Sequence, residues 1–96
     1  MKLAFIIYGN AIDPDVAEVL ENLGLQSYTK WSEVIGKGKT SGPRLGSHVW
    51  PGINSMMMLA IGDEHVAPLA DALKVLKERF SHEGLKLYVL PVDQAL

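Results

Sequence analysis

The segment 36–52 holds the residues that are best suited to bind a ligand. It contains four basic side chains and no acid, although the chain as a whole has a net charge of −2: Lys37, Lys39, Arg44 and His48. It also holds five of the nine glycines, which let backbone N–H groups approach an anion closely. The segment therefore predicts a site for a phosphate or another small anion. A solvated loop whose lysines keep it in water is the alternative interpretation.

Two glycine motifs of nucleotide-binding enzymes do not fit this segment. A P-loop that ends at Lys39 needs a glycine at position 33, where the sequence has Glu33, and a helix directly after it. A dinucleotide fingerprint that begins at Gly36 needs a third glycine at position 41, where the sequence has Ser41. Anion binding here would therefore use another architecture.

Metal ligands and catalytic groups are sparse. The three histidines, His48, His65 and His82, do not lie one helical turn apart, so no single segment encodes a metal site. His48 and His82 become candidate metal ligands only if symmetry brings several copies together. The chain has no cysteine, which excludes thiolate metal sites and thiol catalysis. Because no serine–histidine–acid pattern or marked pair of acids is readable, we expect a protein that is not an enzyme.

Length and composition limit the class of protein. The 96 residues fit one domain, 1–96, and the 48% hydrophobic and 21% charged residues are typical of a globular chain. No apolar run approaches the roughly 20 residues of a membrane helix, so we expect a cytoplasmic protein that is not membrane-embedded. The negative net charge argues against a nucleic acid as partner.

The hydrophobic pattern predicts six elements and one long loop. Strands are expected over 3–8, 25–35, 53–62 and 85–92, and helices over 13–24 and 63–82. Glycine and proline make one continuous loop of 36–52. The order β-α-β-β-α-β predicts an α+β, ferredoxin-like split sandwich, in which both helices cover one face of a four-stranded antiparallel sheet.

The predicted strands are apolar on both faces, whereas two helices can cover only one. In the first strand, for example, Leu3, Phe5 and Ile7 alternate with Ala4, Ile6 and Tyr8. An open apolar face of this kind is rarely left to water. We therefore expect a homo-oligomer in which open sheet faces pack against one another.

The sequence resembles the PII-like signalling proteins, the superfamily of the nitrogen-regulatory PII proteins. The order of elements, Thr29, the run Val34-Ile35-Gly36-Lys37-Gly38-Lys39 and the pair Pro51-Gly52 carry the resemblance, which spans the whole chain. The run at 34–39 looks like that family's second strand leading into its T-loop. Thr40 stands where classical members have glutamine, and 36–52 has no tyrosine for uridylylation. These departures favour a divergent, PII-like branch.

The resemblance implies a homotrimer whose clefts between subunits bind an adenine nucleotide, ATP or ADP, or another small anion. It also implies that the 36–52 loop regulates a partner, such as a membrane transporter or an enzyme. By resemblance, the ligand-binding positions at the base and within this loop are Thr29, Gly36, Lys37, Gly38, Lys39 and Arg44. The alternative is a CutA-like trimer for divalent-cation tolerance or metal transport, with His48 and His82 as metal ligands.

Overall fold

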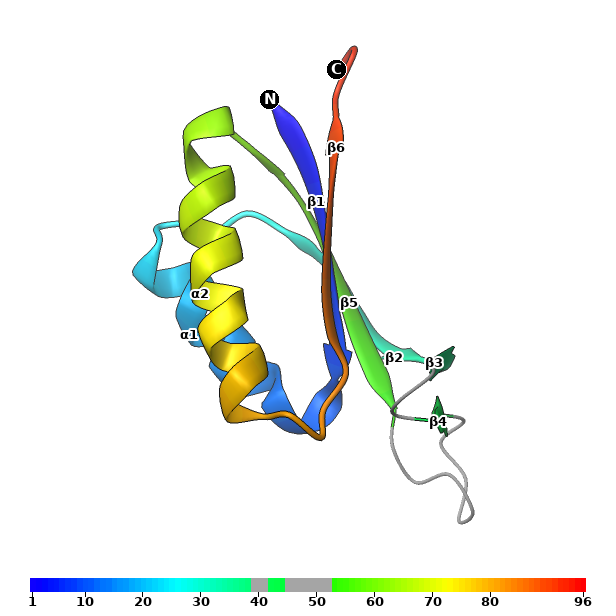
Figure 1. Cartoon of the computed structure of the whole chain (residues 1–96). Coiled ribbons are helices and arrows are strands. Elements are labelled where there is room, and N and C mark those ends of the chain that lie inside the picture. Colours follow the sequence, from blue (N-terminus) through cyan, green and yellow to red (C-terminus); the bar gives the residue numbers. More distant parts are fainter. Residues whose placement is uncertain (39–41, 45–52) are drawn as a thin grey trace.

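A computed structural model describes residues 1–38, 42–44 and 53–96 of the chain (Figure 1). The helical elements are a 3₁₀ turn η1 (Asn10–Ile12), helix α1 (Asp13–Asn22), a second 3₁₀ turn η2 (Asp63–His65) and helix α2 (Val66–Arg79). The strands are β1 (Lys2–Gly9), β2 (Thr29–Val34), β3 (Gly36–Gly38), β4 (Gly42–Arg44), β5 (Asn54–Ile61) and β6 (Leu85–Pro91). None of the helices in these ranges is long and apolar enough to cross a membrane.

The main sheet has the strand order β2-β5-β1-β6, and all of its neighbouring strands are antiparallel. Both helices lie on one side of this sheet, as Figure 1 shows. The ferredoxin-like α+β fold predicted from the sequence is therefore confirmed.

Two predicted boundaries are corrected by the structure. The second strand begins at Thr29 and not at residue 25, because Gly24 takes a positive φ of 72° and the N–H of Leu25 bonds back to the carbonyl of Leu20. The segment 36–52 is not one continuous loop in its described part, because β3 and β4 pair there as a small antiparallel ribbon. Pro43 is tolerated in β4, since both strands of a two-stranded ribbon are edges.

The hydrophobic core fills the space between the helices and one face of the sheet. Ala4, Ile6 and Tyr8 of β1 are completely buried, and Met57 and Leu59 of β5 lie beside them. The helices contribute the matching side chains at helical spacing, namely Val16, Leu20, Leu69, Leu73 and Leu76. The apolar side chains on this face of the sheet are therefore buried within one chain.

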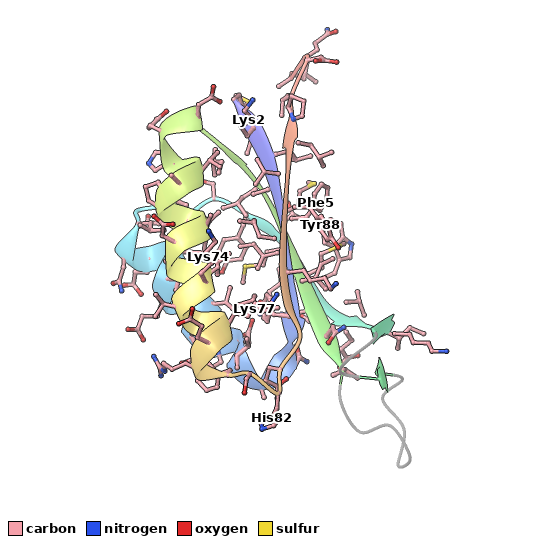
Figure 2. All side chains as sticks on the ribbon, viewed as in Figure 1. Lys2, Phe5, Lys74, Lys77, His82 and Tyr88 are labelled. Atoms are coloured by element: carbon pink, nitrogen blue, oxygen red, sulfur yellow. The ribbon has the colours of Figure 1, made fainter. Side chains whose placement is uncertain are left out.

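The opposite face of the sheet has no such cover within the described chain. Phe5 lies opposite Met58 on one side and Tyr88 on the other, and Trp31 lies opposite Met56. Tyr88 is 52% exposed and Trp31 is 40% exposed. Figure 2 shows Phe5 and Tyr88 on the side of the sheet away from the helices. The expectation of an apolar second face is confirmed, and we call this surface the open face.

A polar cluster joins α1 to the first and second strands. The hydroxyl of the buried Tyr8 donates to the carboxylate of Asp13 at 2.5 Å, and the Lys30 ammonium of β2 lies 2.7 Å from the same carboxylate. Burial, followed by the hydrogen bond to Asp13, raises the pKa of the Tyr8 hydroxyl well above its usual range. Burial alone would raise the pKa of Asp13, but the hydrogen bonds from Lys30 and Tyr8 outweigh it and lower that pKa. The cluster therefore holds an ionised carboxylate between three elements.

We predict that Asp13→Asn makes folding stability less sensitive to acid. The lowered pKa of Asp13 means that its contribution is present above the unfolded pKa of about 3.9 and is lost as pH falls through the folded value. The variant should be less stable than the parent at pH 7, and the difference should shrink in acid. Urea unfolding at neutral pH and at about pH 2.5 measures both differences.

Asp15→Asn is the matched control for this test, because the Asp15 carboxylate lies 3.7 Å from the exposed guanidinium of Arg79 in a weaker ion pair. A stability difference between Asp13→Asn and the parent that stays constant from neutral to acid pH would contradict the account.

Candidate functional site

A pocket of about 290 Å³ opens at the end of the sheet where the described part of the 36–52 segment begins. Its lining comes from β1, β3, β5, β6 and the connection between α2 and β6. The lining residues are Ile7, Gly36, Lys37, Asn54, Gly84, Lys86 and Tyr88. We call it the Lys37–Lys86 pocket.

Strand register brings these residues to one place. Ile7 pairs with Lys86, so both side chains belong to the open face at the end of β1. The N–H of Gly9 bonds to the carbonyl of Gly84 at 3.0 Å, which ties the connection before β6 to the same end of the sheet. The position of the pocket is therefore set by β1 and its neighbours.

Gly36 packs closely against Asn54, and its backbone conformation is an ordinary one. A Cβ atom at this position would come 3.1 Å from the side-chain nitrogen of Asn54. Because this approach is tighter than ordinary van der Waals contact, the Asn54 side chain would have to shift by a few tenths of an ångström to admit a larger residue at 36. The glycine allows β3 to leave the sheet directly beside the pocket.

The polar groups of the pocket suit an anion. Lys37 and Lys86 supply two ammonium groups, and no carboxylate belongs to the lining. The side-chain oxygen of Asn54 is buried and has no hydrogen-bond partner among the described residues, so a ligand could donate to it. Ile7 and the Tyr88 ring give the pocket an apolar wall on which a flat ring could stack.

Two of the predicted ligand-binding residues, Gly36 and Lys37, lie in the pocket. Gly38 ends β3, and the backbone of Arg44 in β4 pairs with Gly36. Thr29 stands at the start of β2, exposed and outside the lining. Since Thr29 and Gly36 are separated by the length of β2, on the order of 20 Å, one chain does not bring them together.

The remaining predicted positions divide into two groups. Lys39 and His48 lie outside the described residues. His82 is exposed in the connection after α2, at the lower end of the molecule in Figure 2. Within the described ranges, no group of three or more histidine, aspartate or glutamate side chains is arranged to hold a metal ion.

Sequence reasoning missed five lining residues of this pocket: Ile7, Asn54, Gly84, Lys86 and Tyr88. One signal for Lys86 was present, because a single cation stands within the otherwise apolar run from Leu85 to Leu90. Lys37, which lines the same pocket, is about 50 positions away in the sequence, and only the register of the strands brings the two lysines together.

Solved structures with the same fold include PII-like proteins. CPII, a nitrogen regulatory PII-like protein from Thiomonas intermedia K12 bound to ADP, AMP and bicarbonate, superimposes with a TM-score of 0.74 at 23% identity, over 97% of this chain and 88% of that chain. A PII-like signalling protein from Thermus thermophilus gives a TM-score of 0.65 at 24% identity, over 92% of this chain and 82% of that chain. No curated protein matches the sequence.

The sequence itself matches a family model along its whole length. That model describes the nitrogen regulatory protein P-II, and the match covers residues 1–96. The two helices and the four-stranded antiparallel sheet agree with this match. The chain therefore belongs to the nitrogen regulatory protein P-II family.

Proposed function

We propose that this protein is a non-enzymatic regulator that binds an adenine nucleotide at the Lys37–Lys86 pocket. One observation carries the proposal, namely a pocket that combines two ammonium groups, an acid-free lining and an apolar wall. The structures of CPII with ADP, AMP and bicarbonate support a nucleoside phosphate as the ligand class. Lys37 and Lys86 would neutralise the phosphates, and Tyr88 would pack against the base.

The size of the pocket argues that one chain supplies only part of the site. Small-molecule sites that bury most of a ligand have volumes of roughly 300–1,000 Å³, and this pocket, at about 290 Å³, is at the small end of that range. A nucleoside diphosphate would therefore project beyond it, over the open face. A second copy that packs on this face would enclose the rest of the ligand.

We further propose that the assembly is a homotrimer with such a site at each contact between copies. The open face supplies the apolar surface for association, and membership of the P-II family supports three copies as the number. In this arrangement Thr29 would reach the nucleotide from a neighbouring copy, which would explain its distance from Gly36 within one chain. Gly38, Lys39 and Arg44 are proposed to act at the base of the loop and within it.

Regulation would follow from the place of β3 in both the site and the loop. Gly36 and Lys37 line the pocket and also pair with the strand β4. A ligand that favours one arrangement of β3 and β4 would therefore change what the 36–52 loop presents to a partner. The proposed partner is a membrane transporter or an enzyme, and the proposed location is the cytoplasm.

We predict that Lys37→Ala and Lys86→Ala each weaken ADP binding about tenfold. A hydrogen bond to a charged group contributes about 1.5–3 kcal/mol, and about 1.4 kcal/mol corresponds to a factor of ten in affinity. Isothermal titration calorimetry with ADP, and with ADP plus bicarbonate, measures the dissociation constants. The matched control is Lys2→Ala, because Lys2 lies on the same strand as Ile7 but outside the pocket.

If Lys37→Ala and Lys86→Ala bound ADP as tightly as the parent, the nucleotide site would lie elsewhere. If the parent did not bind ADP, AMP or ATP at all, the ligand class proposed here would be wrong.

We also predict that Phe5→Glu dissociates the oligomer. Phe5 lies in the middle of the open face between Met58 and Tyr88, so a carboxylate there would have to be buried on association. Sedimentation velocity should show the parent as a trimer and this variant as a monomer. Val75→Glu is the control, because Val75 is 63% exposed on α2, on the other side of the molecule. Equal sedimentation of Phe5→Glu and the parent would rule out the open face as the interface.

A further inference from the structure

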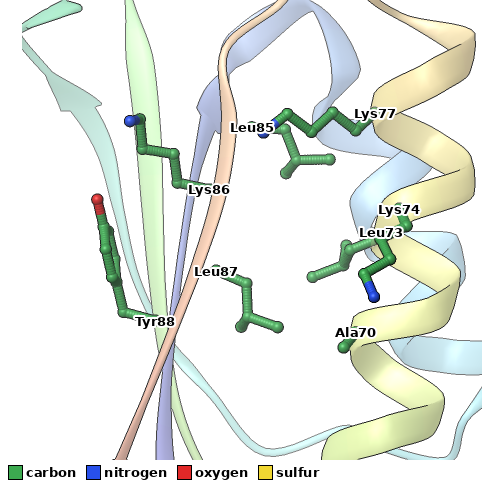
Figure 3. Close-up of a pocket in the computed structure, with 8 residues that line it drawn as sticks. All are labelled: Ala70, Leu73, Lys74, Lys77, Leu85, Lys86, Leu87 and Tyr88. Atoms are coloured by element: carbon green, nitrogen blue, oxygen red, sulfur yellow. The ribbon is translucent and has the colours of Figure 1, made fainter.

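A second groove, of about 340 Å³, runs between α2 and β6 on the helix side of the sheet. Leu73 and Ala70 of α2 and Leu85 and Leu87 of β6 form its apolar floor. Lys74 and Lys77 of α2 stand along one side, and Lys86 and Tyr88 of β6 border the other, as Figure 3 shows. We call it the α2–β6 groove.

The strand β6 is an edge of the main sheet, and its outer side has no strand partner among the described residues. The N–H of Gly9 donates to the carbonyl of Gly84, and the N–H of Val92 donates to the carbonyl of Met1. These two hydrogen bonds show which residues of β6 turn their backbone groups toward β1. Even-numbered residues of β6 therefore direct their backbone groups to β1, and Leu85, Leu87 and Val89 direct theirs outward. Pro91 has no N–H, so the open edge is limited to these three residues.

The charged side chains that line the groove are all basic. Its lining includes Lys74, Lys77 and Lys86 and no acid. Among the described residues, none of these three lysines takes part in an ion pair. The nearby acids of α2, Asp71 and Glu78, do not belong to the lining. An open edge with outward N–H groups thus lies beside three cations and a leucine floor.

We propose that the α2–β6 groove binds an extended, acidic peptide segment of a partner protein, which adds to the sheet along β6. Its backbone would pair with Leu85, Leu87 and Val89, and alternate carboxylates on the helix side of the strand would reach Lys74 and Lys77. The apolar side chains, which alternate with the carboxylates, would lie on the other face of the strand, beside Tyr88. This contact surface is separate from the 36–52 loop, and it shares only Lys86 and Tyr88 with the Lys37–Lys86 pocket, so Lys74 and Lys77 test it without touching the proposed nucleotide site.

Charge favours this occupant over a second copy of the chain. Pairing of two β6 edges would bring two sets of the three lysines together, which is unfavourable. The other sheet edge, β2, carries one acid, Glu33, and one cation, Lys30, so it offers no net charge to the groove. An acidic strand from another protein would pair with the outward backbone groups of β6, and its carboxylates would neutralise the lysines.

The test uses fluorescence anisotropy with a labelled synthetic peptide of about eight residues that alternates glutamate and valine, a typical strand length. The parent should bind it, and Lys74→Glu/Lys77→Glu should weaken binding at least about tenfold. Lys2→Glu reverses a single charge outside the groove and should leave binding within about twofold. The exposed positions of Lys74 and Lys77 allow the variants to fold, which circular dichroism verifies.

A second readout locates the peptide on the edge strand. Amide hydrogen exchange of Leu85 and Leu87 should slow on peptide binding, whereas the amides of Lys86 and Tyr88, already bonded to β1, should change little. The proposal fails if the parent does not bind the peptide, or if the double variant binds as well as the parent. It also fails if a peptide of the same composition without alternation binds equally, or if the amides of Leu85 and Leu87 keep their exchange rates.

Discussion

The two helices cover only one face of the sheet, and the rest of the molecule depends on this constraint. Tyr8 and the core strands are buried beneath α1 and α2, while Phe5, Trp31 and Tyr88 stand on the side that the helices do not reach. Burial of apolar surface contributes roughly 25 cal/mol per Å² to the free energy of folding or association. Association of copies through this face would therefore stabilise each folded chain. The same face carries the Lys37–Lys86 pocket, so association and ligand binding would occupy one surface.

The core and the candidate site are linked through the second strand. Lys30 anchors β2 to the Asp13 carboxylate, and the Ser55 hydroxyl lies 3.1 Å from the Ser32 carbonyl of the same strand. Two residues beyond β2, Gly36 packs against Asn54 and opens β3. The base of the 36–52 segment thus follows a strand that is anchored to Asp13 and Ser55, an arrangement that would let a small ligand control a loop through its first residues.

Much of the fold was readable from the sequence, because alternation in the strands and the Asp13-Pro14 helix start are local signals. The apolar second face was also readable, since Phe5, Met58 and Tyr88 each break the usual apolar and polar alternation. The β3–β4 ribbon and most of the pocket were not. Lys86 and Asn54 join Gly36 only through strand register, which is a property of the folded sheet. The role proposed for Thr29 depends on a neighbouring copy, which no pattern within one chain encodes.

Native mass spectrometry with ADP tests the central claim most directly, because it reports chain number and nucleotide number in the same ion. The account predicts that ADP stays bound to trimers of the parent, with up to one nucleotide for each chain. It also predicts that Phe5→Glu, which keeps every lining residue of the Lys37–Lys86 pocket, loses both association and ADP. Single chains that retain ADP, or trimers of the parent that never bind it, would contradict the claim that the site is completed between copies.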